Sequence, residues 1–172
     1  MKKSLLSKLR SLMSVPKDNP GLIKAQYIAL SRQLPMMYFI LLVNTLVLAG
    51  THYSAAPGWL AIGCPFLMTV FGTKRAVEWW RSRNNLPSPE RMLAAIKRTN
   101  HLAPFVALAF TAWSLALFPY GDVYGQTHVA FYMAITVIAC IFCMMHLLPA
   151  ALATTAVVNT GFVVFFGNTN NI

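Results

Sequence analysis

Acidic residues are scarce in this sequence: only four occur among 172 residues, namely Asp18, Glu78, Glu90 and Asp122. They form no paired-carboxylate motif of the kind that acid–base catalysis uses. The sequence also has no nucleotide-binding glycine loop, no metalloprotease helix motif, and no serine or cysteine nucleophile with a nearby base. We therefore predict that this chain is not itself an enzyme.

Charge of either sign is also rare. Charged residues make up 10% of the chain and hydrophobic residues 57%, whereas roughly 25% of the residues in an ordinary soluble domain are charged. This composition is typical of a membrane protein. The three cysteines (Cys64, Cys140 and Cys143) all lie in apolar segments, so they do not form the disulfide framework of a secreted domain.

The net charge of +10 comes from 14 lysines and arginines in two blocks. Loops that carry basic residues face the cytoplasm in membrane proteins, so both blocks are expected there, together with the N-terminus. This distribution predicts a multi-pass membrane protein with no nucleic-acid partner. The first block is Lys2, Lys3, Lys8, Arg10, Lys17, Lys24 and Arg32, and the second is Lys74, Arg75, Arg81, Arg83, Arg91, Lys97 and Arg98.

Long apolar runs predict an all-α fold, a polytopic transmembrane helix bundle. The clearest run, residues 127–148, has 22 residues without Lys, Arg, Asp or Glu, enough to cross a bilayer as one helix. Ser88, Pro89 and Glu90 predict a helix start that leads through basic residues into the third span. The five predicted spans are Pro35–Tyr53, Trp59–Gly72, His101–Phe118, 127–148 and Pro149–Phe166, with a sixth expected beyond the chain end.

The segment before the first span is expected to lie on the membrane surface. Residues 2–13 place Leu5, Leu9 and Leu12 on one helical face, with lysines and arginine mostly elsewhere, as in an interfacial helix bound to anionic lipids. The predicted organisation is therefore a basic amphipathic segment at 1–33, a transmembrane domain at 34–166 and a polar tail at 167–172.

The four histidines fall at the predicted span ends. His52 and His128 are expected on the outer side, and His101 and His146 on the inner side. His128 and His146 are 18 residues apart in sequence, about 27 Å along a helix, so one metal cannot bind both. Two pairs could each hold a haem b. Interfacial histidines that merely reach water, and a proton-responsive role, are the alternatives.

A second candidate site is the run of Cys140, Cys143 and His146 at intervals of three residues. Thiolate and imidazole ligands suit a soft metal such as copper, or zinc. Simple packing is the alternative, because buried cysteine behaves as a small hydrophobic side chain.

Several stretches together resemble the N-terminal membrane region of bacterial cyclic-di-GMP signalling proteins that carry GGDEF and EAL output domains. The most specific stretch is the run MAITVIACIFCMMH at 133–146. The other stretches are QYIALSRQLP at 26–35, THY at 51–53, AP at 56–57, FTAW at 110–113, PYGD at 119–122 and HVAF at 128–131.

The resemblance implies a sensory domain of the bacterial inner membrane that passes a stimulus to a cytoplasmic output domain of the same polypeptide, a diguanylate cyclase, a phosphodiesterase or both. It also implies a homodimer and an even number of spans, usually six, which would bring the output domain to the cytoplasm. Neither a GGDEF nor an EAL motif occurs in this sequence. The alternative function is a stand-alone haem- or metal-binding membrane protein in electron transfer.

Overall fold

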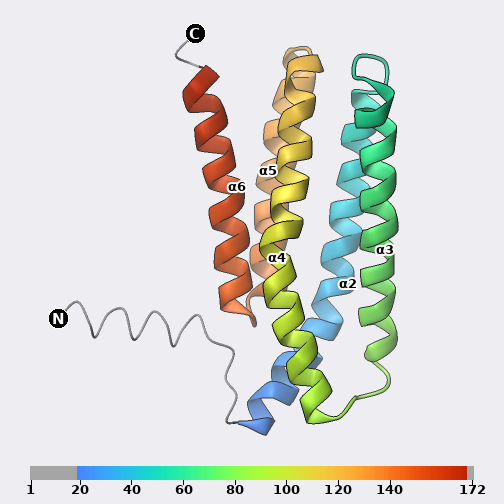
Figure 1. The fold of residues 1–172 in the computed structure, drawn as a ribbon, viewed down its shortest axis with the longest axis vertical. Coiled ribbons are helices and arrows are strands. Elements are labelled where there is room, and N and C mark those ends of the chain that lie inside the picture. The colour runs from blue at the N-terminus through green and yellow to red at the C-terminus, as the bar shows by residue number, and fades with distance from the viewer. Residues whose placement is uncertain (1–18, 170–172) are drawn as a thin grey trace, which may run out of the picture.

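Five long helices run alternately up and down beside one another in the computed structural model, which describes residues 19–169 (Figure 1). This part of the chain contains helices and loops but no β-strand. The five helices are long and apolar enough to cross a membrane, which confirms the predicted fold class. The elements are α2 (Pro20–Thr51), η1 (Trp59–Gly63), α3 (Cys64–Ser82), α4 (Pro89–Leu117), η2 (Phe118–Tyr120), α5 (Val123–Met144) and α6 (Leu148–Thr169).

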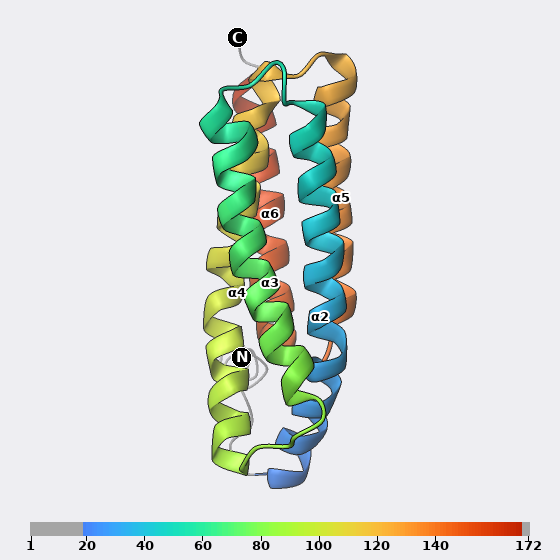
Figure 2. The ribbon, with the colours of Figure 1, turned by 90° about the vertical axis from the view of Figure 1, so that its right-hand side faces the viewer.

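Neighbouring helices form a closed bundle (Figure 2). α2 packs mainly against α3 and α5, α6 packs against α4 and α5, and α4 also contacts α2. The loop after α2, the loop before α5 and the end of α6 lie at the upper end in Figure 1, and the α3–α4 loop and α5–α6 turn lie at the lower end. The predicted interfacial segment at 2–13 falls outside the described residues.

The first predicted span is too short at its start. α2 is one helix of 32 residues, and it continues through Pro35, which was expected to begin the span. A proline inside a helix removes only one backbone donor, and buried packing can offset that loss. Here Pro35 is itself buried in the bundle. The amphipathic residues before it are therefore the lower turns of α2, which extend below α5 and α6 (Figure 1).

The fourth span lies four residues earlier than predicted. Asp122 caps α5, since its carboxylate accepts a hydrogen bond of 2.8 Å from the Gly125 amide, and this cap starts the helix at Val123. α5 then ends at Met144, and α6 begins at Leu148 with Pro149 in its first turn. The second span also continues past Gly72, to Ser82. The predicted helix start at Pro89 is confirmed, although the Ser88 side chain makes no capping bond.

Both basic blocks, as far as they are described, lie toward the lower end of the bundle. Lys24 and Arg32 are in the first half of α2, Lys74, Arg75 and Arg81 are in the second half of α3, and Arg91, Lys97 and Arg98 are in the first half of α4. The lysines and arginines in these helices are therefore gathered at the lower end of the bundle, and the two connections at the upper end contain none.

A buried polar connection joins the helices in the upper half. The Cys64 amide bonds to the Trp59 carbonyl in the π-helical turn, and Pro65 has no N–H, so the Leu60 carbonyl lacks a donor from its own helix. The Trp113 indole donates to that carbonyl instead, at 2.9 Å. The Trp113 ring also packs edge-on against Tyr132, with centroids 5.9 Å apart.

The same connection reaches α2. The hydroxyl of Tyr132 lies 3.0 Å from that of Thr45, which donates to the Leu41 carbonyl at 2.7 Å. Together these contacts join η1, α4, α5 and α2 through buried groups, and they fix the mutual rotation of these helices.

Candidate functional site

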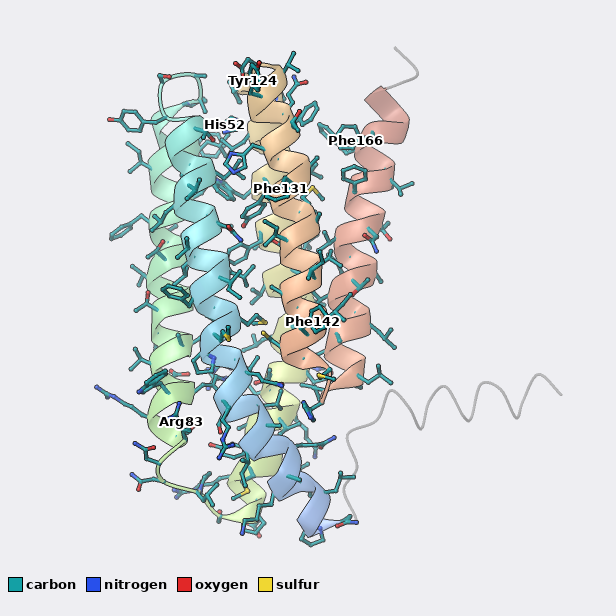
Figure 3. The ribbon with its side chains drawn as sticks, turned by 180° about the vertical axis from the view of Figure 1, so that it is seen from behind. His52, Arg83, Tyr124, Phe131, Phe142 and Phe166 are labelled. Carbon is teal, nitrogen blue, oxygen red and sulfur yellow. The ribbon has the colours of Figure 1, made fainter. Side chains whose placement is uncertain are left out.

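His52 is the predicted site residue with the most constrained surroundings. It caps the C-terminus of α2 and is 1% exposed (Figure 3). Its Nδ1 lies 3.0 Å from the Leu48 carbonyl and 3.1 Å from the Thr51 hydroxyl oxygen. A carbonyl only accepts hydrogen bonds, so Nδ1 carries the proton and Nε2 presents a lone pair.

The Nε2 atom of His52 is buried and has no hydrogen-bond partner within the described part of the chain. It faces the loop that enters α5. A Cβ atom built on Gly121 would lie 2.9 Å from this nitrogen, and one on Gly125 would lie 3.2 Å from it. Glycine at these two positions therefore lets the loop backbone close over the imidazole ring.

Gly121→Ala is expected to destabilise the protein by about 1–3 kcal/mol, because the added methyl group overpacks against His52 and the Gln126 amide. Thermal unfolding in detergent would measure the change. The matched control is Gly50→Ala at the same end of the bundle, where a Cβ meets nothing within 4 Å. That control is expected to be neutral or slightly stabilising, since alanine favours helix. Equal unfolding temperatures for the two variants would contradict the described loop position.

The structure brings the predicted outer pair together through Thr51. The Thr51 hydroxyl donates to the Leu48 carbonyl at 2.8 Å, so its oxygen is free to accept. His128 Nδ1 lies 3.3 Å from that oxygen and His52 Nδ1 lies 3.1 Å from it. One threonine thus joins a buried histidine on α2 to a partly exposed histidine on α5.

One feature of this pair favours binding of a haem or metal, and another opposes it. An imidazole whose Nδ1–H is held by a carbonyl and whose Nε2 is unbonded has the orientation of a ligating histidine. Gly121 and Gly125, however, lie so close to Nε2 that a Cβ atom built on them would be 2.9 Å and 3.2 Å from it, which leaves little room for a metal ion. A metal at His52 would therefore require the loop to move away from the ring.

The predicted inner pair, His101 and His146, makes no contact of this kind. His146 is exposed in the turn between α5 and α6, where its Nδ1 lies 3.1 Å from the Gln33 side-chain oxygen and its carbonyl accepts from Gln26 at 3.2 Å. His101 is exposed on α4, and its side chain makes no hydrogen bond or ion pair within residues 19–169. The role of His146 in this structure is to join the α5–α6 turn to α2.

Cys140, Cys143 and His146 are not brought together. Because α5 ends at Met144, His146 is not the next position on the same helical face. Cys140 and Cys143 are buried free thiols. Within residues 19–169 no group of three His, Cys, Asp or Glu side chains is placed to hold a metal ion.

Sequence reasoning missed a second polar centre, around Arg75. This arginine is only 6% exposed. Its Nη1 donates to the Glu78 carboxylate at 2.8 Å and its Nη2 to the Thr99 hydroxyl at 3.4 Å. The sequence feature that could have indicated its burial is helical register, because Arg75 shares one face of α3 with two buried residues, Gly72 and Trp79. A buried charge at such depth is costly and marks a functional candidate.

Arg75 lines a small internal cavity where all five long helices meet. The cavity has a volume of about 30 Å³, close to the space that one water molecule occupies. Most of its wall is apolar, and the hydroxyl oxygens of Thr136 and Thr154, both buried, have no hydrogen-bond partner in the described chain. The polar residues that line it come from every long helix: Tyr38, Arg75, Thr99, Thr136, Cys140 and Thr154.

No protein-family model, curated protein or solved structure matches this chain. The assignment of a function therefore depends on the chemistry of these two polar centres and on their position in the bundle.

Proposed function

We propose that this chain is the transmembrane sensory domain of a cyclic-di-GMP signalling protein. It would relay a stimulus to a cytoplasmic GGDEF or EAL output domain of the same polypeptide and would not itself be catalytic. The supporting observation is that five helices meet at one small, mostly apolar cavity that the buried Arg75 helps to line. A change in any one helix there alters the packing of the others, and this is what a bistable input element requires.

In this proposal the lower end of the bundle faces the cytoplasm of a bacterial cell, because the basic residues lie there. Membrane lipids surround the bundle, and a second copy completes a homodimer, as the resembling family implies. His52, at the opposite end, is the sensing candidate: a proton or ligand that reaches its unbonded Nε2 would have to displace the end of the loop at Gly121 and the first turn of α5 at Gly125.

Helix α2 connects the region of His52 to the lower end of the bundle. α2 is one continuous helix from the position of His52 down to Gln33 and Gln26, and both glutamines contact His146 in the α5–α6 turn. A displacement of α2 relative to α5 at the upper end would therefore strain these polar contacts roughly 30–40 Å away, given 1.5 Å per residue. The relay needs only a small rotation or shift between packed helices.

The reading frame of the gene tests this proposal most cheaply. We expect the codons after Ile172 to encode one more apolar span and then a GGDEF or EAL domain. A stop codon directly after Ile172 would contradict a relay within one polypeptide and would favour the second candidate.

The second candidate is a small haem- or metal-binding protein in electron transfer, and the orientation of the His52 ring is the observation that favours it. Absorption spectra of the detergent-purified protein, before and after dithionite, would test it. A Soret band that sharpens and shifts on reduction, and that disappears in His52→Ala, would assign haem b to the outer pair. A featureless spectrum from cells with ample haem would remove the haem candidate.

A further inference from the structure

A basic cleft opens between α2, α3 and α4 at the lower end, separate from the His52 region. Its volume is about 330 Å³, within the range of small-ligand sites. Three arginines line it, Arg75 from α3 and Arg91 and Arg98 from α4, together with one acid, Glu78. The cleft therefore carries a net charge of about +2 from its lining side chains.

Two of these arginines have no acidic partner. The Glu78 carboxylate is already paired with Arg75 at 2.8 Å, and this is the only ion pair within residues 19–169. Arg91 and Arg98 are both exposed and lie seven residues apart, on the same face of α4. Ala94 and Ala95 lie between them on the cleft wall, so small side chains leave space beside the two guanidinium groups.

The third arginine gives the cleft a buried, preformed wall. The Arg75 side chain is 8% exposed. Its two terminal nitrogens are used by Glu78 and Thr99, but its Nε is buried without a partner in the described chain. The buried charge of Arg75 adds to the positive potential of the cleft, and the planar guanidinium groups of Arg91 and Arg98 suit the bidentate binding of phosphate.

The cleft lies near the level of the α5–α6 turn, where lipid headgroups would surround a membrane-spanning bundle. Tyr27 lines the cleft, and its neighbour Gln26 donates to the His146 carbonyl in the α5–α6 turn. The cleft is thus level with the point where α5 and α6 turn back. Tyr27 also packs against Trp79, with ring centroids 5.3 Å apart. Both rings are buried, so this contact forms the inner wall of the cleft.

We propose that this cleft binds a phosphate group, carried by an anionic phospholipid headgroup or by a free phosphate. Arg91 and Arg98 would contact the phosphate oxygens, and Arg75 would close the inner side. Glu78 disfavours anions, but its pairing with Arg75 and its partial exposure reduce that effect. Basic pockets between membrane helices bind lipid phosphates in this way. This site does not depend on the proposed sensory function.

Ligand-dependent thermal unfolding of the full chain in a neutral detergent tests the site. The probes are phosphatidylglycerol, the zwitterionic phosphatidylcholine and inorganic phosphate. The test variant is Arg91→Gln with Arg98→Gln. The matched control is Arg81→Gln with Arg83→Gln, which removes the same charge from the same end, outside the cleft. All four residues are exposed, so the fold should tolerate both variants.

We expect phosphatidylglycerol to raise the unfolding temperature of the wild type and the control at similar concentrations. The cleft variant should need about 10-fold more lipid or greater, as the loss of charge-assisted bonds predicts. Stabilisation by phosphatidylglycerol alone would identify a lipid site. An equal effect of inorganic phosphate, lost in the same variant, would identify a site for soluble phosphate. Equal responses of the cleft variant and the control, or equal effects of phosphatidylcholine and phosphatidylglycerol, would overturn the proposal.

Discussion

Trp113→Ala should destabilise the bundle by about 3–5 kcal/mol, a larger loss than we expect from any other single substitution in the upper core. Trp113 is 4% exposed and packs against Tyr132. In lipid, helices associate through close packing and buried polar bonds rather than through the hydrophobic effect. Removing the indole would therefore leave a cavity between α4 and α5 and would leave the Leu60 carbonyl without its donor.

The hydrogen bond and the packing can be separated. Trp113→Phe keeps an aromatic ring but removes the donor, and about 1–3 kcal/mol should be lost, because a buried carbonyl is left unsatisfied. Trp59→Phe is the control, since Trp59 is 67% exposed on the same end of the bundle and should change stability little. Unfolding in mixed detergent micelles, followed by circular dichroism, would measure all three variants. If Trp113→Phe were as stable as Trp59→Phe, the hydrogen bond to the Leu60 carbonyl would contribute nothing to the stability of the protein.

Arg75→Leu is also expected to destabilise the bundle, by about 1–3 kcal/mol. The substitution leaves Glu78 without its partner and Thr99 without a donor. The loss stays below that of a fully buried pair because the Glu78 side chain is 40% exposed and water can solvate it. Stability against detergent-induced unfolding would measure the loss.

A double-mutant cycle tells whether the ion pair causes the loss. Arg75→Leu combined with Glu78→Gln should recover part of the stability, since the second change removes the unpaired carboxylate. Arg83→Leu is the control: Arg83 makes no ion pair in the described chain, although its guanidinium lies 5.0 Å from the Trp80 ring centroid. Strictly additive losses at the two positions would mean that Arg75 and Glu78 do not interact.

The spans could be predicted from sequence because apolar length alone decides which segments cross a membrane. Their ends could not be predicted closely. α2 passes through Pro35 because tertiary packing compensates for one lost hydrogen bond, which no local rule reveals. The early start of α5 could have been predicted more easily from the sequence, since an aspartate before an apolar run, here Asp122, is a recognised capping signal.

The two polar centres differ in how much the sequence reveals. Histidine depth in the sequence made His52 and His128 a possible pair without placing them in contact. The link through Thr51 and the close approach of Gly121 depend on a loop that returns from about 70 residues further along the chain. In the sequence, Arg75 is one cation of a basic block. Its burial follows from its register on α3, which composition and charge blocks do not reveal.

Cellular cyclic-di-GMP concentration, in bacteria that express the complete gene, tests the proposed function most directly. The comparison is between wild type, Arg75→Gln and the control Arg83→Gln, at equal protein levels in the membrane fraction. If the cavity where the helices meet sets the output, Arg75→Gln should change the concentration by about 5-fold or more, and Arg83→Gln should leave it near the wild-type value. Equal concentrations in all three strains, matching a strain without the gene, would contradict a sensory role in cyclic-di-GMP signalling.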